Sequence, residues 1–428
     1  MAAREKSRLI QPIGLMPGSP SNFLPPLQSL FRHFLTLGIH MKKRVLLKTA
    51  AIAAAALALG SAMAQDTTFK IGLILPLTGP FASTGKQIEA AARLYMAQNG
   101  ALAGGKKVEL IVKDDTSTPD VTKRIAQEML VNDKVNVLAG FGLTPLAFAT
   151  APLATQSKTP MVVMAAATSS ITQASPYIIR TSFTLPQAAV AIADWAPKNG
   201  IKKAVTLVTD FGPGLDAEKF FRDRFLFNGG QVTESIRVPL RNPDFAPFLQ
   251  KVRDAKPDAV YAFVPSGAGA ALMKQFTERG LDKAGIKLIG TGDVTDDDIL
   301  NGMGDVALGV VTSHHYSAAH PGAVNKKFVE AFAKANGGLR PNFMAVGGYD
   351  GMRVIYEAAK TTKGGRGDAL LEAMKGQIFE SPRGPMFIDA QTRDVVHNIY
   401  IRKVEKKDGQ LYNVEFDTVK DVKDPGKN

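Results

Sequence analysis

The sequence contains no cysteine, and only six of its 428 residues are histidine. Without cysteine the chain can form no disulfide, offer no thiol nucleophile or thiolate metal ligand, and carry no lipid on an N-terminal cysteine. Hydrophobic residues make up 45% of the chain and charged residues 21%. This composition allows two or three domains with full cores and argues against global disorder.

The excess of positive charge lies near the N-terminus. Residues 1–64 contain eight Lys or Arg and one acid, so they contribute +7 of the formal net charge of +13 and leave +6 for the following 364 residues. The remaining basic residues are scattered and form no arginine-rich stripe interleaved with aromatics. Nucleic-acid binding is therefore not indicated.

Residues 41–64 have the three parts of a secretory signal peptide. Lys42-Lys43-Arg44 forms the basic start, an apolar run centred on residues 50–59 follows, and Ala62-Met63-Ala64 is an A-x-A cleavage site. The apolar run is short for a bilayer span and polar residues follow it, which favours cleavage over a permanent transmembrane helix. We expect translation to start at Met41, residues 1–40 to be a mis-annotated upstream extension, and the mature protein to be periplasmic without a lipid anchor.

From Phe69 onward, short apolar runs alternate with longer amphipathic segments. Expected strands lie at 70–75, 108–112, 135–139, 161–164, 204–209, 231–238, 259–264 and 287–290. Expected helices lie at 85–98, 120–132, 146–156, 188–199, 215–228, 245–256, 268–279, 324–336 and 344–361. This alternation predicts parallel sheets covered by helices on both faces, and two such sets predict two α/β lobes. A hairpin is expected around the turn Asp408-Gly409.

Three loops in the first half follow expected strands and carry glycine or small hydroxyl residues: 76–85, 140–145 and 165–170. Open α/β sheets bind ligands at the carboxyl ends of their strands. Thr144 and Thr168 would stand near helix N-termini, where hydroxyl and backbone N–H groups can hold a carboxylate. Each threonine could instead simply cap its helix.

Three loops in the second half have the same location: 209–214, 264–269 and 290–293. Phe211 could cover an apolar ligand, and Asp293 could pair with an ammonium group. The alternatives are that Phe211 belongs to the core and that Asp293 caps a loop. The run Asp296-Asp297-Asp298 lacks the spacing of a calcium loop, and we expect it to start a helix.

Catalytic patterns are poorly represented after residue 64. The sequence has no G-x-S-x-G or H-E-x-x-H motif. His314 and His315 could bind a metal together with His320, but adjacent side chains diverge in an extended segment, which disfavours this site. We predict a protein that is not an enzyme and holds no cofactor.

Several segments together resemble the periplasmic leucine/isoleucine/valine-binding protein family, the solute receptors of ABC importers. They are Ile71–Pro80 followed by Gly85, the Thr144 loop, Ala166-Ala167-Thr168, Asp210-Phe211-Gly212 and Gly347-Gly348-Tyr349-Asp350. The resemblance extends from Thr67 to the C-terminus.

The resemblance implies a type I periplasmic binding fold, in which two α/β lobes joined by three crossovers close on a ligand. The lobes would comprise 65–183 with 316–385, and 184–315 with 386–428. The family's ligand-binding positions map onto Thr84, Thr144, Ala166, Thr168, Phe211, Ser266 and Asp293. Thr144, Ala166 and Thr168 would hold the ligand's α-carboxylate, Phe211 would cover the ligand, and Asp293 would pair with its α-ammonium.

The chain also departs from the family pattern. Family members often have Tyr at the position of Phe211 and Glu at that of Asp293. The position of Thr84 can hold a large aromatic, and the loop 265–267 is smaller and less aromatic here than in receptors for branched aliphatic amino acids. We expect a monomeric receptor for an amino acid, most simply of the branched-chain type, that delivers it to an inner-membrane permease. The alternatives are the same receptor fold for an aromatic or other organic acid, a secreted α/β hydrolase, and a ligand-sensing domain of a signalling protein.

Overall fold

The computed structural model describes residues 67–241 and 243–427. The predicted signal peptide at 41–64 and the extension at 1–40 lie outside these residues. Asp66–Asn428 form one compact unit. None of the described helices is both long enough and apolar enough to cross a membrane.

The first sheet has six strands in the order β2-β3-β1-β4-β5-β6. It is parallel except for β2, which runs antiparallel to β3. The strands are β1 (Thr68–Leu75), β2 (Leu102–Ala103), β3 (Lys106–Asp114), β4 (Val137–Gly140), β5 (Met161–Val163) and β6 (Ile178–Arg180). β4 and β5 are buried at every position, which explains why they read as continuous apolar runs.

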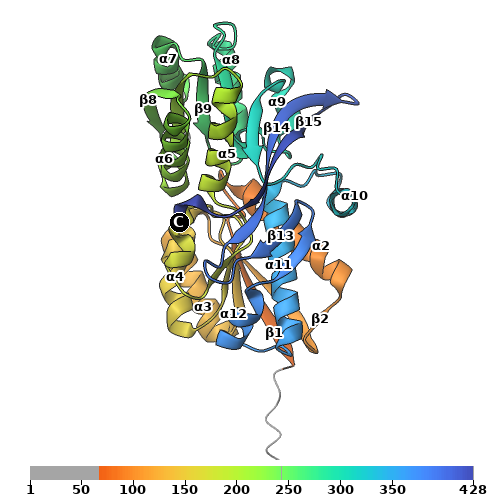
Figure 1. The fold of residues 1–428 in the computed structure, drawn as a ribbon. Coiled ribbons are helices and arrows are strands. Elements are labelled where there is room, and N and C mark those ends of the chain that lie inside the picture. Colours follow the sequence, from red (N-terminus) through yellow and green to blue (C-terminus); the bar gives the residue numbers. More distant parts are fainter. Residues whose placement is uncertain (1–66, 242, 428) are drawn as a thin grey trace, which may run out of the picture. The chain divides into compact units, whose positions relative to one another are not determined.

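Helices cover both faces of this sheet. The helices are α2 (Ala82–Asn99), α3 (Pro119–Glu128) with the π-turn η1 (Met129–Asp133), α4 (Thr144–Ser157), α11 (Phe343–Thr361) and α12 (Gly367–Met374). α2 packs against α11, and α3 packs against α4. The two pairs lie on opposite sides of β1 (Figure 1). The predicted doubly wound arrangement of the first half is confirmed.

The second sheet has nine strands, eight of them in the order β12-β13-β14-β11-β10-β9-β7-β8, while β15 pairs with β14. The strands are β7 (Lys203–Thr209), β8 (Gln231–Val238), β9 (Ala259–Phe263), β10 (Lys287–Thr291), β11 (Val311–His314), β12 (Ile378–Ser381), β13 (Gly384–Ile388), β14 (Val395–Lys407) and β15 (Gln410–Val422). β7 to β10 are parallel, as expected, and β11 continues this parallel order, but β12 to β15 are antiparallel. The sheet is therefore mixed rather than purely parallel.

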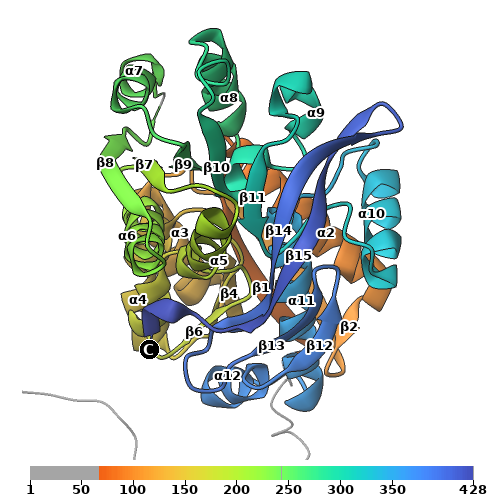
Figure 2. The same cartoon turned by 45° about the horizontal axis from the view of Figure 1, so that its top comes forward.

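The hairpin of β14 and β15 has a local cause. Asp408 and Gly409 have φ values of 50° and 77°, so a two-residue turn reverses the chain between the paired residues Lys407 and Gln410. Turns with positive φ at both central residues match the twist of antiparallel strands. The predicted hairpin is confirmed, and Figure 2 shows its two long strands side by side.

The remaining helices belong mainly to the second half of the chain. They are η2 (Ser169–Gln173), α5 (Leu185–Lys198), α6 (Gly212–Phe227), α7 (Ala246–Ala255), α8 (Gly269–Glu278), η3 (Gly292–Thr295), α9 (Leu300–Met303), η4 (Asp305–Ala307), α10 (Ala323–Ala335) and η5 (Pro425–Lys427). α5 packs against α6 and against β10, β11 and β14. The sequence expectations missed the short strands β2, β6 and β11 to β13 and the helices α9 and α12.

The expectation that Asp296-Asp297-Asp298 starts a helix is wrong. These residues form the loop between η3 and α9. Asp296 and Asp297 are buried because their carboxylates accept hydrogen bonds from distant side chains, including Asn342 Nδ2 at 2.9 Å and Asn413 Nδ2 at 3.1 Å. These tertiary partners outweigh the local preference of acidic residues for a helix N-terminus.

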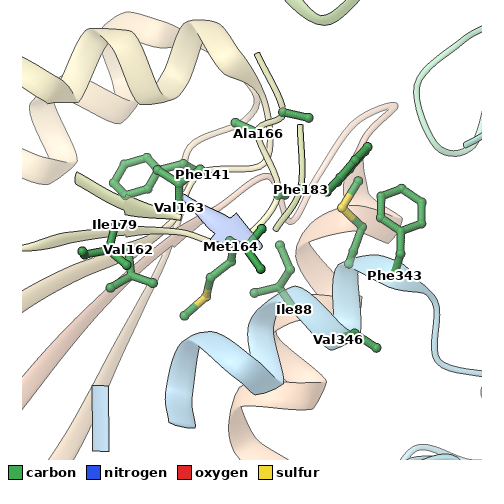
Figure 3. Packing of buried hydrophobic residues seen from close by; sticks show 14 of the residues in the cluster. Ile88, Phe141, Val162, Val163, Met164, Ala166, Ile179, Phe183, Phe343 and Val346 are labelled. Carbon is green, nitrogen blue, oxygen red and sulfur yellow. The ribbon is translucent and has the colours of Figure 1, made fainter. Parts of the chain in front are cut away.

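Two neighbouring glycines allow α11 to pack tightly against the end of β5 and against α2. A Cβ atom on Gly347 would lie 2.1 Å from Met164 O, and one on Gly348 would lie 2.9 Å from Ile88 O. Figure 3 shows Met164 and Ile88 beside the labelled Val346 of this helix. The Gly347-Gly348 segment of the family resemblance is therefore a packing feature.

Candidate ligand-binding site

The site begins where parallel strands of the first sheet end side by side. Ile74 of β1 pairs with Gly140 of β4, and Gly140 pairs with Val163 of β5. The loops that follow these three strands therefore leave the same edge of the sheet. This is the edge at which open α/β sheets hold ligands.

The turn after β4 has an unusual backbone. Gly140 and Phe141 have φ values of 108° and 65°, and a Cβ on Gly140 would lie 2.3 Å from Ile74 O. Phe141 is fully buried, and its carbonyl accepts a hydrogen bond from Ala166 N at 3.0 Å. The core thus holds a left-handed residue in place, and such residues concentrate at functional sites.

Thr144 and Thr168 come together at this edge. Thr144 is the first residue of α4, Thr168 precedes η2, and their hydroxyl oxygens lie 2.9 Å apart. Neither side chain caps its helix. Within the described residues, the N–H groups of both threonines also have no hydrogen-bond acceptor. One of the two hydroxyl protons is used in this contact, so the other hydroxyl and the two N–H groups remain as neutral donors for an anion.

The second half supplies the opposite wall. Phe211 follows β7, Ser266 lies in the loop after β9, and Asp293 lies in η3 directly after β10. Phe211 stacks on Phe263 with ring centroids 6.0 Å apart and an interplanar angle of 21°. Parallel strands again deliver all these residues to one edge.

A cavity lies between the two walls, and residues of both halves of the chain line it. Six of the seven residues expected at the site line the cavity: Thr84, Thr144, Ala166, Phe211, Ser266 and Asp293. The seventh, Thr168, joins them through its hydrogen bond to Thr144. Ala166 contributes a wall rather than a donor because its N–H is already bound to Phe141.

The sequence interpretation missed most of the apolar lining. The additional residues are Phe81, Gly142, Leu143, Ala165, Ala167, Phe183, Leu185, Pro213, Phe263, Pro265 and Met344. Phe81 and Phe263 had a usable signal, since each is an aromatic residue at or near the carboxyl end of an expected strand. Phe183 and Met344 come from segments that no loop rule assigns to a site.

The two halves touch around the cavity. Ser169 N donates to Asp216 Oδ2 at 2.8 Å, and Ser83 Oγ donates to Asp298 Oδ2 at 2.6 Å. A Cβ on Gly212 would lie only 2.7 Å from Thr168 Oγ1. The first turn of α6 therefore packs directly over the threonine pair.

Ser266 and Asp293 are held by different buried groups. Ser266 Oγ donates to Asp296, and burial together with the nearby Asp298 raises the pKa of Asp296 well above its usual range. Asp293 Oδ2 accepts from Thr291 Oγ1 at 2.9 Å and lies 3.7 Å from His314 Nε2. Burial lowers the pKa of His314 to about 4, so this imidazole is neutral at pH 7.

The side chains of His314 and His315 do not diverge as the sequence led us to expect. The rings of His314 and His315 lie with their centroids 4.4 Å apart and do not diverge. His320 is bound elsewhere, with Nδ1 2.8 Å from Glu415 Oε2. Among the described residues, no group of three His, Cys, Asp or Glu side chains is arranged to hold a metal ion.

A model of the periplasmic binding protein family matches residues 68–410. The chain belongs to this family. It is 43% identical to Leu/Ile/Val-binding protein homolog 6 of Brucella abortus (strain 2308), over 89% of this chain and 98% of that protein. The family assignment and the type I periplasmic binding fold expected from the sequence are thus confirmed.

Solved structures of ABC-transporter solute-binding proteins are also similar. One from Rhodopseudomonas palustris BisB5, in complex with 3,4-dihydroxybenzoic acid, is 63% identical with a TM-score of 0.83, covering 85% of this chain and 100% of that chain. Another from R. palustris, in complex with 4-hydroxybenzoate, is 39% identical with a TM-score of 0.81, covering 84% and 99%. The family member described here is accordingly an extracytoplasmic solute-binding protein, and its relatives are receptors rather than hydrolases.

Proposed function

We propose that this family member is the periplasmic receptor of an ABC importer for aromatic carboxylates. It captures the acid between two lobes, at 65–183 with 316–385 and at 184–315 with 386–428, and closes by hinge movement. It then delivers the ligand to an inner-membrane permease. It acts as a monomer after removal of the signal peptide.

The observation that carries this proposal is the aromatic lining of the cavity. Four phenylalanines from both halves of the chain line it: Phe81, Phe183, Phe211 and Phe263. Aromatic rings prefer offset-stacked or edge-to-face contacts with another ring, and such pairs add to the free energy of apolar burial. A flat aromatic ligand uses this lining better than a branched aliphatic side chain does.

The carboxylate of the ligand binds at the threonine pair. Thr144 and Thr168 offer neutral hydroxyl and N–H donors, and Thr144 also stands at the positive end of the α4 dipole. No Lys or Arg is among the described residues that line the cavity. The carboxylate is therefore held by oriented neutral donors. A hydrogen bond from such a donor is stronger when the acceptor is an ionised carboxylate than when it is an uncharged group.

The similar structures point to the same ligand class. The R. palustris proteins that are 63% and 39% identical were solved with hydroxylated benzoic acids. The branched-chain amino-acid reading remains the second candidate because the Brucella relative is named for Leu, Ile and Val and because Asp293 could pair with an ammonium group.

A direct binding comparison separates the two candidates. Isothermal titration calorimetry of the purified protein with benzoate, hydroxybenzoates, leucine and valine should give saturable binding with the aromatic acids. Because a ligand that binds the folded state raises its melting temperature, a thermal-shift series over the same compounds should rank them alike. Binding of leucine without binding of any aromatic acid would overturn the proposal.

A further inference from the structure

Asp293 provides a second polar end in the aromatic cavity. It is the single charged residue among the described residues that line the cavity, and it is 4% exposed. It follows a strand of the second sheet, whereas the two threonines follow strands of the first. A ligand held by its carboxylate at the threonines would therefore meet a carboxylate of the protein on the opposite wall.

One carboxylate oxygen of Asp293 accepts a hydrogen bond from the protein, and the other is available to a ligand. Oδ2 accepts from Thr291 Oγ1 at 2.9 Å and lies 3.7 Å from His314 Nε2. Within the described residues, no hydrogen bond reaches Oδ1, and this atom is not fully buried. Oδ1 is thus the acceptor that remains for a ligand.

His314 is held firmly in its place behind Asp293. Its ring centroid lies 4.7 Å from that of the cavity residue Phe183 and 4.4 Å from that of Phe343. The side chain is fully buried, and neither ring nitrogen has a hydrogen-bond partner in the described part of the chain. The aromatic neighbours thus keep Nε2 near Asp293, 3.7 Å from Oδ2.

Positive charge already lies behind this carboxylate. The buried guanidinium of Arg402 is close to Gly292, where a Cβ would lie 2.2 Å from Nη2 and 2.5 Å from His314 Cγ. The charge of Arg402 acts on Asp293, although Asp297, whose Oδ2 lies 3.9 Å from Nη1, is its first carboxylate partner. A compensated carboxylate attracts an ammonium less strongly, yet it still accepts a hydrogen bond from a neutral hydroxyl.

We propose that Asp293 Oδ1 accepts a hydrogen bond from a ring hydroxyl of the aromatic acid, and that Thr291 and His314 are positioning residues that aim it. This inference rests on the proposed function and adds a specificity: the receptor distinguishes hydroxylated benzoates from benzoate. A site built to bond a hydroxyl rejects the analogue that lacks it, because the buried acceptor is then left unpaired.

Calorimetry with benzoate, 3-hydroxybenzoate, 4-hydroxybenzoate and 3,4-dihydroxybenzoate tests this inference. The unaltered protein should bind at least one hydroxylated acid on the order of tenfold or more tighter than benzoate. Asp293→Leu should abolish this preference, so that the hydroxylated acids and benzoate bind with affinities within about threefold of one another. Asp293→Asn keeps an acceptor and should retain part of the preference.

Thr291→Val and His314→Gln test the positioning roles. Each should lower the ratio of hydroxybenzoate to benzoate affinity, and neither should lower it further when combined with Asp293→Leu. A purely structural role would weaken all ligands in parallel. Because the readout is a ratio within each variant, partial loss of active protein does not change it.

The possible failures are distinguishable. Equal affinity of the unaltered protein for benzoate and all hydroxylated acids would overturn this inference and leave the aromatic-carboxylate receptor intact. A preference that survives Asp293→Leu would also overturn it. Failure to bind any aromatic acid would instead reject the proposed function itself.

Discussion

The hydroxyl oxygens of Thr144 and Thr168 lie 2.9 Å apart, although the two residues follow different strands of the first sheet. Parallel pairing of β4 with β5 places both loops at one sheet edge. The contact satisfies two polar groups that are 2% and 6% exposed, and it leaves their remaining hydrogen-bonding capacity for a ligand.

Replacing both threonines by valine should weaken binding of an aromatic acid. Loss of the hydroxyl that donates to the ionised carboxylate is expected to raise the free energy of binding by roughly 1–3 kcal/mol. Thr150→Val on the same helix is the matched control, because Thr150 is equally buried but bonds Leu146 O within α4. Unchanged affinity in calorimetry of the double variant would reject the carboxylate assignment.

Gly212→Ala should weaken binding without unfolding the protein. The added Cβ would lie 2.7 Å from Thr168 Oγ1 and 3.3 Å from Thr144 Cγ2, so closure over the threonine pair becomes strained. Overpacking of this kind costs about 1–3 kcal/mol.

Gly302→Ala serves as the control for this variant, because a Cβ at that helical glycine meets nothing within 4 Å. Affinity of the Gly212→Ala variant should fall while the melting temperatures of both variants stay near that of the unaltered protein. If the two variants bind the aromatic acid with equal affinity, close packing of α6 against the threonine pair does not affect binding.

Asp350→Ala should strongly reduce stability. Asp350 Oδ2 lies 2.7 Å from Arg383 Nη2, and both side chains are buried, so removing the carboxylate strands a guanidinium in the core. Breaking a buried pair in this way costs about 3–5 kcal/mol. Glu357→Gln on the same helix removes a half-exposed ion pair with Lys360 and should cost at most about 1 kcal/mol. Urea unfolding of the two variants measures the difference in their unfolding free energies. Similar midpoints would contradict the assignment of Asp350 and Arg383 as a stabilising buried ion pair.

Stability should depend on pH through His314. Burial lowers the pKa of His314 to about 4, while the unfolded side chain titrates near 6.5. Between these values the unfolded chain binds more protons, so this contribution to stability is complete above pH 6.5 and is lost as the pH falls. From pH 7.5 to pH 5 the loss amounts to about 2 kcal/mol.

The variant His314→Gln should show a correspondingly flatter pH dependence in urea unfolding. Burial raises the pKa of Asp115 and of Asp297 to about 6, and these carboxyls favour the folded state as the pH falls. Their effect is common to both proteins and cancels in the difference. Parallel profiles for variant and unaltered protein would contradict the buried, neutral state of His314.

Much of the fold could be predicted from the local sequence pattern, and the predictions that failed did so for clear physical reasons. The alternation of apolar runs and amphipathic segments located β1 and α2 to within a few residues. The short strands β6 and β11 were missed because three or four residues carry too little periodicity. Asp296 was misassigned because its hydrogen-bond partners, Ser266 and Asn342, are distant in sequence.

The sequence by itself determined that loops after parallel strands would meet at one edge, because strand polarity fixes where each carboxyl end lies. This placed Thr144 beside Thr168 and brought Asp293 to the opposite wall. Only the tertiary structure decided which rings line the cavity and that His314 stands behind Asp293. Periodicity records which face of an element is buried, whereas contacts between two sheets depend on how the complete chain packs.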